Sequence, residues 1–181
     1  MKRVVISLCA LFLMLTGCSS KRNTLSADHI VNQSQMEIYE TYYDAVMNAD
    51  SYMEESENYT ISTEMNKVPD GTYRYYVIFD EPKTAMFNCI ILAVENDISY
   101  KDADKMMPSA GIFDTPSNMI PNQVNYDDGY VKGIALSGET DQNGVDLKIL
   151  VQWTNQDGSH TSREFIHRSL TADDSQKFFN R

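Results

Sequence analysis

The chain has 181 residues, of which 26 are acidic and 15 are basic, and its formal net charge is −11. This length suits one globular domain with its own hydrophobic core. The excess of acids excludes a basic nucleic-acid binder, because such proteins need clustered Lys and Arg to neutralise phosphates.

The first 17 residues differ in composition from the rest. Two bases, Lys2 and Arg3, precede an apolar run over residues 4–15, and no acid occurs in this stretch. The run is shorter than the roughly 20 residues that a membrane-spanning helix needs, and the pattern is typical of a cleavable secretory signal. Without residues 1–17 the loss of two bases changes the formal charge from −11 to −13.

The predicted signal ends in Leu15-Thr16-Gly17-Cys18, followed by Ser19. These four residues resemble the lipobox of bacterial lipoproteins. The resemblance implies cleavage between Gly17 and Cys18 by lipoprotein-processing enzymes, and a diacylglycerol thioether on Cys18. A doubly acylated residue anchors a protein far more firmly than a single chain does. The expected location is therefore the extracytoplasmic face of the cell membrane. In a host with two membranes the outer membrane is the alternative, because Ser19 replaces the Asp that retains lipoproteins in the inner one.

The three cysteines fit this prediction. Cys9 leaves with the signal and Cys18 carries the lipid, so Cys89 is the one cysteine left for the domain, and no intrachain disulfide is expected. Apolar neighbours over residues 86–92 indicate a buried, inert thiol.

Residues 18–33 are polar and without pattern, and we expect a flexible tether there. A capping box formed by Ser34 and Glu37 predicts the start of a helix. Apolar residues at steps of three and four then predict one amphipathic helix over about 35–57. Its apolar stripe consists of Met36, Tyr39, Tyr43, Val46, Ala49 or Asp50, and Met53.

From Tyr59 onward the apolar period is two, and turn residues separate the segments. Residues 84–95 are apolar on both faces apart from Asn88, which is typical of a central strand. A turn at 155–159 predicts a hairpin, and a cap at 171–174 predicts a short C-terminal helix through residue 179. The expected strands cover residues 59–65, 72–80, 84–95, 130–137, 145–154 and 160–169.

These elements predict a single globular domain over residues 34–181. The pattern favours a mainly β fold, an immunoglobulin-like antiparallel β-sandwich preceded by one amphipathic helix. The alternative is an α+β fold in which the helix packs on one curved antiparallel sheet, as in cystatin-like domains.

Residues 106–123 interrupt the strand pattern with three prolines and several large apolar side chains. A long connection without regular structure is often functional, so we predict a partner surface here. The alternative is an irregular edge whose apolar residues fold into the core. The candidate contact residues are Met106, Met107, Ile112, Phe113 and Met119.

No catalytic motif is recognisable, and no catalytic residue, cofactor or metal site is expected. The histidines His29, His160 and His167 are scattered along the chain. Between Arg22 and Lys67 there are nine acids and no base, which predicts either a solvated helix face or a surface for a cationic partner.

The sequence therefore favours a non-catalytic binding module of the cell envelope, whose partner is an envelope protein or polymer. One alternative is an envelope hydrolase or transferase with an unrecognised site, which a pocket where His160 or His167 meets an acid and a hydroxyl would favour. A second alternative is an accessory lipoprotein of a membrane transporter or secretion complex.

Overall fold

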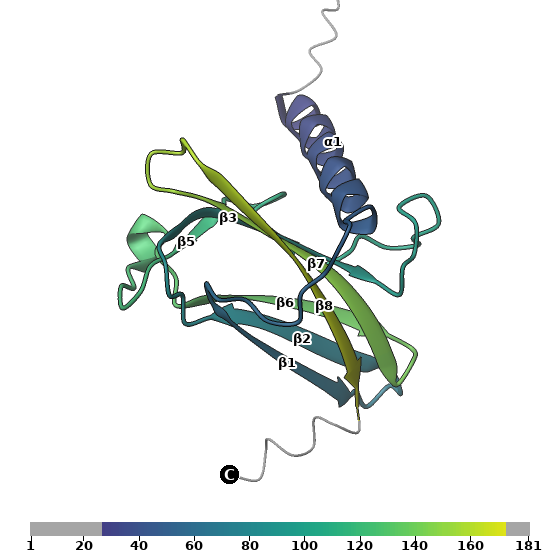
Figure 1. Cartoon of the computed structure of the whole chain (residues 1–181). Coiled ribbons are helices and arrows are strands. Elements are labelled where there is room, and N and C mark those ends of the chain that lie inside the picture. The colour runs from purple at the N-terminus through teal and green to yellow at the C-terminus, as the bar shows by residue number, and fades with distance from the viewer. Residues whose placement is uncertain (1–26, 173–181) are drawn as a thin grey trace, which may run out of the picture.

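The computed structural model describes residues 27–172 and shows a mainly β fold with one long helix (Figure 1). The predicted fold class is confirmed. The elements are α1 (Ala27–Met47), β1 (Thr60–Lys67), β2 (Tyr73–Asp80), β3 (Met86–Glu95), β4 (Ser109–Ala110), β5 (Ser117–Met119), the 3-10 helix η1 (Tyr126–Asp128), β6 (Gly133–Thr140), β7 (Gly144–Thr154) and β8 (Thr161–Thr171).

The strands form two antiparallel sheets that face each other. The smaller sheet has the order β1-β2-β6, and the larger has the order β4-β3-β7-β8, with β5 pairing to β3. Tyr75, Val77 and Phe79 alternate along β2 and are fully buried between the sheets, as their spacing predicts. Two facing sheets agree with a sandwich and differ from the single curved sheet of the cystatin-like alternative.

The strand β3 is covered on both faces, as its apolar sequence predicts. Ile91 and Ala93 face the core between the sheets, whereas Leu92 and Val94 belong to a second cluster under α1. All four side chains are fully buried. The molecule therefore has three layers, with the larger sheet in the middle.

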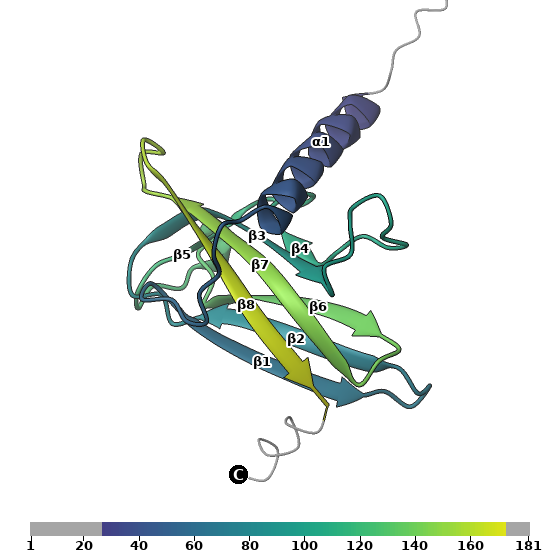
Figure 2. The same ribbon diagram turned by 45° about the vertical axis from the view of Figure 1, so that its right-hand side comes forward.

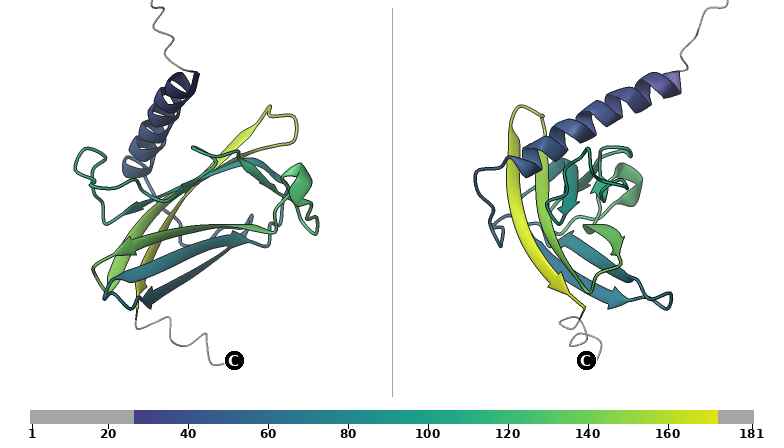
Figure 3. Two further views of the ribbon diagram at one scale, coloured as in Figure 1. Left: turned by 180° about the vertical axis from the view of Figure 1, so that it is seen from behind. Right: turned by 90° about the vertical axis from the view of Figure 1, so that its right-hand side faces the viewer.

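Helix α1 lies across the outer face of the larger sheet and extends beyond its edge (Figures 2 and 3). Tyr39, Tyr43 and Val46 of the predicted stripe are buried against Leu92 and Leu150 of the sheet. The N-terminal part of the helix projects away from the body, so only its C-terminal half is docked.

The helix lies about eight residues nearer the N-terminus than predicted. It covers Ala27–Met47 instead of 35–57, so Ser34 is inside the helix and caps nothing, and residues 27–33 are helical where a flexible tether is predicted.

The predicted end of the helix is wrong because the chain after Met47 pairs with a strand. The Asn48 side chain donates a hydrogen bond to the Asp44 carbonyl at 2.7 Å, at the point where the helix stops. Met53 then forms a parallel bridge with Ile166. Its amide donates to the Phe165 carbonyl at 2.9 Å, and the His167 amide donates to its carbonyl at 3.0 Å. This pairing covers part of the β8 edge.

The C-terminal helix predicted from residue 171 lies almost entirely outside the described residues. Within them, β8 continues as strand to Thr171, where the prediction has the cap.

Candidate functional site

Three of the five predicted contact residues belong to the core instead of a surface. Met107, Ile112 and Met119 are 2%, 5% and 0% exposed. The segment is held to the larger sheet by β4 and β5, which both pair with β3. The prediction is therefore wrong for these three residues. Met119 of β5 joins the core between the sheets, whereas Met107 and Ile112 flank β4 and join the cluster under α1. Met106 and Phe113 remain exposed, at 49% and 40%.

Met106 and Phe113 lie beside an aromatic cluster that joins α1 to the loop after β3. The Phe113 ring centroid is 5.6 Å from that of Tyr39. Tyr43 Oη donates to the Ile98 carbonyl at 2.6 Å, and Tyr100 Oη donates to Glu40 Oε1 at 2.6 Å. Met106 also lines a shallow groove of about 400 Å³ beside the helix. The tyrosines here hold the loop against α1.

A buried carboxylate holds the same loop from its other end. Glu95 is 2% exposed. Its carboxylate accepts a hydrogen bond from Tyr75 Oη at 2.7 Å and lies 2.8 Å from Lys105 Nζ. The Lys105 ammonium also contacts the Glu139 carbonyl. These contacts satisfy the buried charge and fix the loop to both sheets.

Gly138 makes room for this arrangement. It lies directly opposite Tyr75 in the ladder between β2 and β6, and a Cβ at this position would come within 2.3 Å of Tyr75 Oη. Burial and the neighbouring Glu95 carboxylate raise the pKa of Tyr75, so its hydroxyl remains a hydrogen-bond donor over the physiological range.

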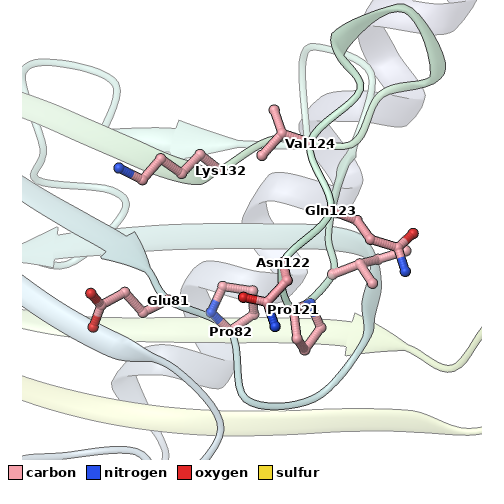
Figure 4. Close-up of a pocket in the computed structure, with 8 residues that line it drawn as sticks. Glu81, Pro82, Pro121, Asn122, Gln123, Val124 and Lys132 are labelled. Atoms are coloured by element: carbon pink, nitrogen blue, oxygen red, sulfur yellow. The ribbon is translucent and has the colours of Figure 1, made fainter.

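A pocket of about 550 Å³ opens at one end of the sandwich (Figure 4). Its walls are connections between strands of the two sheets: the connection after β2, the turn that follows β5, and the residue before β6. Small-molecule sites in proteins have volumes of roughly 300–1,000 Å³. The lining residues are Glu81, Pro82, Ile120, Pro121, Asn122, Gln123, Val124 and Lys132.

The turn after β5 has the chemistry of a type II turn. The Gln123 amide donates to the Ile120 carbonyl at 3.2 Å, Pro121 occupies the second position, and Asn122 has a φ of 59° at the third. Proline and asparagine are favoured at these two positions. The turn therefore presents the Asn122 and Gln123 side chains to the pocket on a fixed backbone.

Unlike Asn122, Glu81 has a strained backbone conformation. Its φ is 46°, although it has a Cβ and precedes Pro82, which disfavours helical conformations in the preceding residue. Such outliers cost roughly 1–3 kcal/mol and concentrate at functional sites. This pocket is not among the sites predicted from the sequence, although the Pro121-Asn122 pair is a local signal for its turn.

His167 lies near an acid and a hydroxyl, which is the grouping that the hydrolase alternative requires. The Ser169 hydroxyl donates to Asp146 Oδ1, and His167 Nε2 is 3.8 Å from the same oxygen. The hydroxyl is bonded to the acid and not to the imidazole, so the histidine is not placed to activate it. The His167 and Asp146 side chains are 44% and 66% exposed on the sheet surface.

The other histidines do not join this group. The His160 amide donates to Asn155 Oδ1 within the turn between β7 and β8. The His29 side chain lies outside the part of the chain whose side chains the structure describes. Among the residues that the structure describes, no three His, Cys, Asp or Glu side chains are grouped as metal ligands.

Cys89 is fully buried. Burial raises the pKa of its thiol to about 12, which agrees with the inert thiol predicted for it. The predicted lipid attachment at Cys18 and the cleavage site after Gly17 lie outside the described residues. No helix within residues 27–172 is both long and apolar enough to cross a membrane.

Comparison with protein-family models and with curated proteins found no match for this chain.

Proposed function

We propose that this protein is a bacterial lipoprotein, anchored in the cell membrane through Cys18, whose β-sandwich acts outside the membrane as a non-catalytic binding module. The observation that carries the proposal is the motif Leu15-Thr16-Gly17-Cys18 directly behind a basic and apolar signal. A short signal of this kind is removed, whereas two acyl chains on the retained cysteine hold the protein at the surface.

The position of α1 supports this proposal. Eight residues separate Cys18 from the first residue of α1, and they reach at most about 3.5 Å each. The N-terminal end of α1 projects from the body (Figure 2). Attachment at this end leaves the pocket at the end of the sandwich and the outer face of the smaller sheet accessible.

A binding role is favoured over the enzymatic alternative. The pocket residues include no Ser, Cys or His, which supply most nucleophiles and general bases. The exposed His167 lacks a hydrogen-bonded hydroxyl. The proposed partners remain the membrane, the processing enzymes and an envelope protein or polymer.

Substitution of the two N-terminal cysteines tests the anchor. Cys18→Ser removes the thiol that the lipid requires, and we expect this variant to leave the detergent phase in a Triton X-114 partition of expressing cells. Cys9→Ser is the matched control, since it changes a cysteine of the signal outside the motif and is expected to partition like the wild type. Full retention of the Cys18→Ser variant in the detergent phase would contradict the proposal.

A further inference from the structure

The pocket at the end of the sandwich contains two opposite charges that the fold brings together without pairing them. The ladder between β2 and β6 ends with Asp80 opposite Gly133. One more step of the same register would place Glu81 opposite Lys132. Opposite charges in this relation are normally favourable cross-strand pairs.

The strained backbone at Glu81 prevents that pairing. At a φ of 46° the chain leaves the ladder, and Thr60 Oγ1 donates to Glu81 Oε2 at 3.2 Å instead. Within residues 27–172 the Lys132 ammonium takes part in no hydrogen bond or ion pair. Both side chains reach toward the same side of the pocket in Figure 4. A carboxylate and an ammonium are thus held apart at one opening.

The rest of the wall is suited to a peptide. The side-chain amides of Asn122 and Gln123 stand on the type II turn and offer both donors and acceptors, which are the groups that a peptide bond needs. Pro82, Pro121 and Val124 add apolar surface, and Val124 is 52% exposed. A volume of about 550 Å³ is more than a single small amino acid needs.

We propose that this pocket binds a short zwitterionic peptide, with the peptide ammonium at Glu81 and the peptide carboxylate at Lys132. This inference deepens the proposed binding role and rests on it, but it does not depend on the lipid anchor. An uncharged saccharide would use the amides alone and would leave both charges without a counter-ion. The separated charges therefore favour a ligand that carries both signs.

Calorimetric titration of the full-length protein in detergent tests the proposal with trialanine as the probe. We expect saturable binding of trialanine, weakened at least about tenfold when the peptide is N-acetylated or C-amidated, because each change removes one charge contact. The Lys132→Gln variant should bind trialanine and its amide equally. The Glu81→Gln variant should bind trialanine and its acetylated form equally.

Two variants of exposed charges outside the pocket serve as matched controls. Lys101→Gln and Glu57→Gln should bind trialanine as the wild type does, and circular dichroism checks that all four variants are folded. The proposal is overturned if trialanine shows no saturable heat up to about 10 mM, or if the capped peptides or maltotriose bind as well as trialanine does. It is also overturned if Lys132→Gln keeps the preference for the free carboxylate. The two proposals fail independently, because the Cys18→Ser protein should lose its anchor but still bind trialanine.

Discussion

Glu81 shows how one residue connects backbone strain to the pocket. A glycine accepts a φ of 46° without steric cost, although it loses more conformational entropy on folding. Relief of roughly 1–3 kcal/mol of strain exceeds an entropic cost of roughly 0.5–1 kcal/mol. We therefore expect Glu81→Gly to increase the free energy of unfolding by about 1 kcal/mol, which raises Tm by roughly 2–4 °C.

Urea denaturation of Glu81→Gly measures this gain. The Gly111→Ala variant makes the opposite change, since it adds a Cβ at a residue with a positive φ. Gly111 also has a positive φ, of 77°, and a Cβ there would come within 2.3 Å of the Cys89 carbonyl oxygen. Gly111→Ala should therefore lower the free energy of unfolding. A loss of stability in Glu81→Gly would show that the glutamate is not strained.

The ion pair of Glu95 and Lys105 should contribute to the stability of the fold. Lys105→Met leaves the Glu95 carboxylate buried with Tyr75 as its remaining partner. We expect a loss of about 2–4 kcal/mol in the free energy of unfolding, because an uncompensated buried charge is costly. The loss is smaller than for a fully buried pair, since the Lys105 side chain is partly exposed. Denaturation of the double variant Lys105→Met, Glu95→Gln should recover much of this loss. A single variant as stable as the wild type would contradict the role given to the pair.

Buried phenols and the buried thiol predict a dependence of stability on pH. Burial raises the pKa of Tyr43 to about 12 from the ordinary value of 10.0 for a tyrosine, and that of Cys89 to about 12 from the ordinary 9.0 for a thiol. Both groups are neutral when protonated, so the native state holds these protons more tightly than the unfolded chain does. Their contribution is complete below pH 9 and is lost as the pH rises from about 9 toward 12.

Urea unfolding between pH 8 and pH 11 measures this effect. The free energy of unfolding should change little between pH 8 and pH 9 and then fall up to pH 11. Cys89→Ala should make this fall less steep although it lowers stability at every pH. A free energy that stays constant from pH 8 to pH 11 would be inconsistent with these raised pKa values.

At the scale of the element, docking of α1 depends on a few aromatic side chains in its C-terminal half. Tyr43 is fully buried, with 0% of its surface exposed, and its ring contacts the Tyr39 and Tyr100 rings. Tyr43→Ala should lower the free energy of unfolding by about 3–5 kcal/mol, the range for deletion of a buried aromatic ring. Denaturation followed by circular dichroism gives this value.

The matched control on the same helix is Ile38→Ala. Ile38 is 42% exposed, so its replacement should change stability by less than about 1 kcal/mol. Equal losses in the two variants would mean that α1 is not docked through its tyrosine face.

The errors in the predicted helix have local causes. Residues 27–33 lie in the projecting part of α1, where no sheet is present to require an apolar stripe, so the periodic signal was absent there. Met53 continued the periodicity by chance, but its backbone pairs with β8. Periodicity detects the docked part of a helix, whereas its projecting end and its termination depend on other contacts.

The strands were more predictable than the irregular segment. Alternation along β2 and the double-sided burial of β3 follow directly from their apolar residues. In contrast, the burial of Met119 in β5 and of Met107 just before β4 depends on how these short strands pair with β3, and strands of two or three residues leave no periodic pattern. Glu81 and Lys132 are about fifty positions apart in the sequence, so their proximity depended on the register of β2 with β6.

At the scale of the whole molecule, the proposed anchor and the projecting helix act together. A helix of 21 residues is about 30 Å long. Its sequence contains Asp28, Glu37, Glu40 and Asp44 but no Lys or Arg, so an anionic lipid surface would repel it. With Cys18 as the attachment point, α1 would hold the sandwich and its pocket away from the headgroups.

The mass of the N-terminal peptide from membranes tests the central proposal most directly. After membrane extraction and digestion with trypsin, the account predicts a peptide of residues 18–21 that begins at Cys18 and carries a diacylglycerol group on the thiol. The same digest should contain no peptide from residues 4–17. A mature chain that begins elsewhere, or one whose Cys18 has a free thiol, would contradict the lipoprotein assignment.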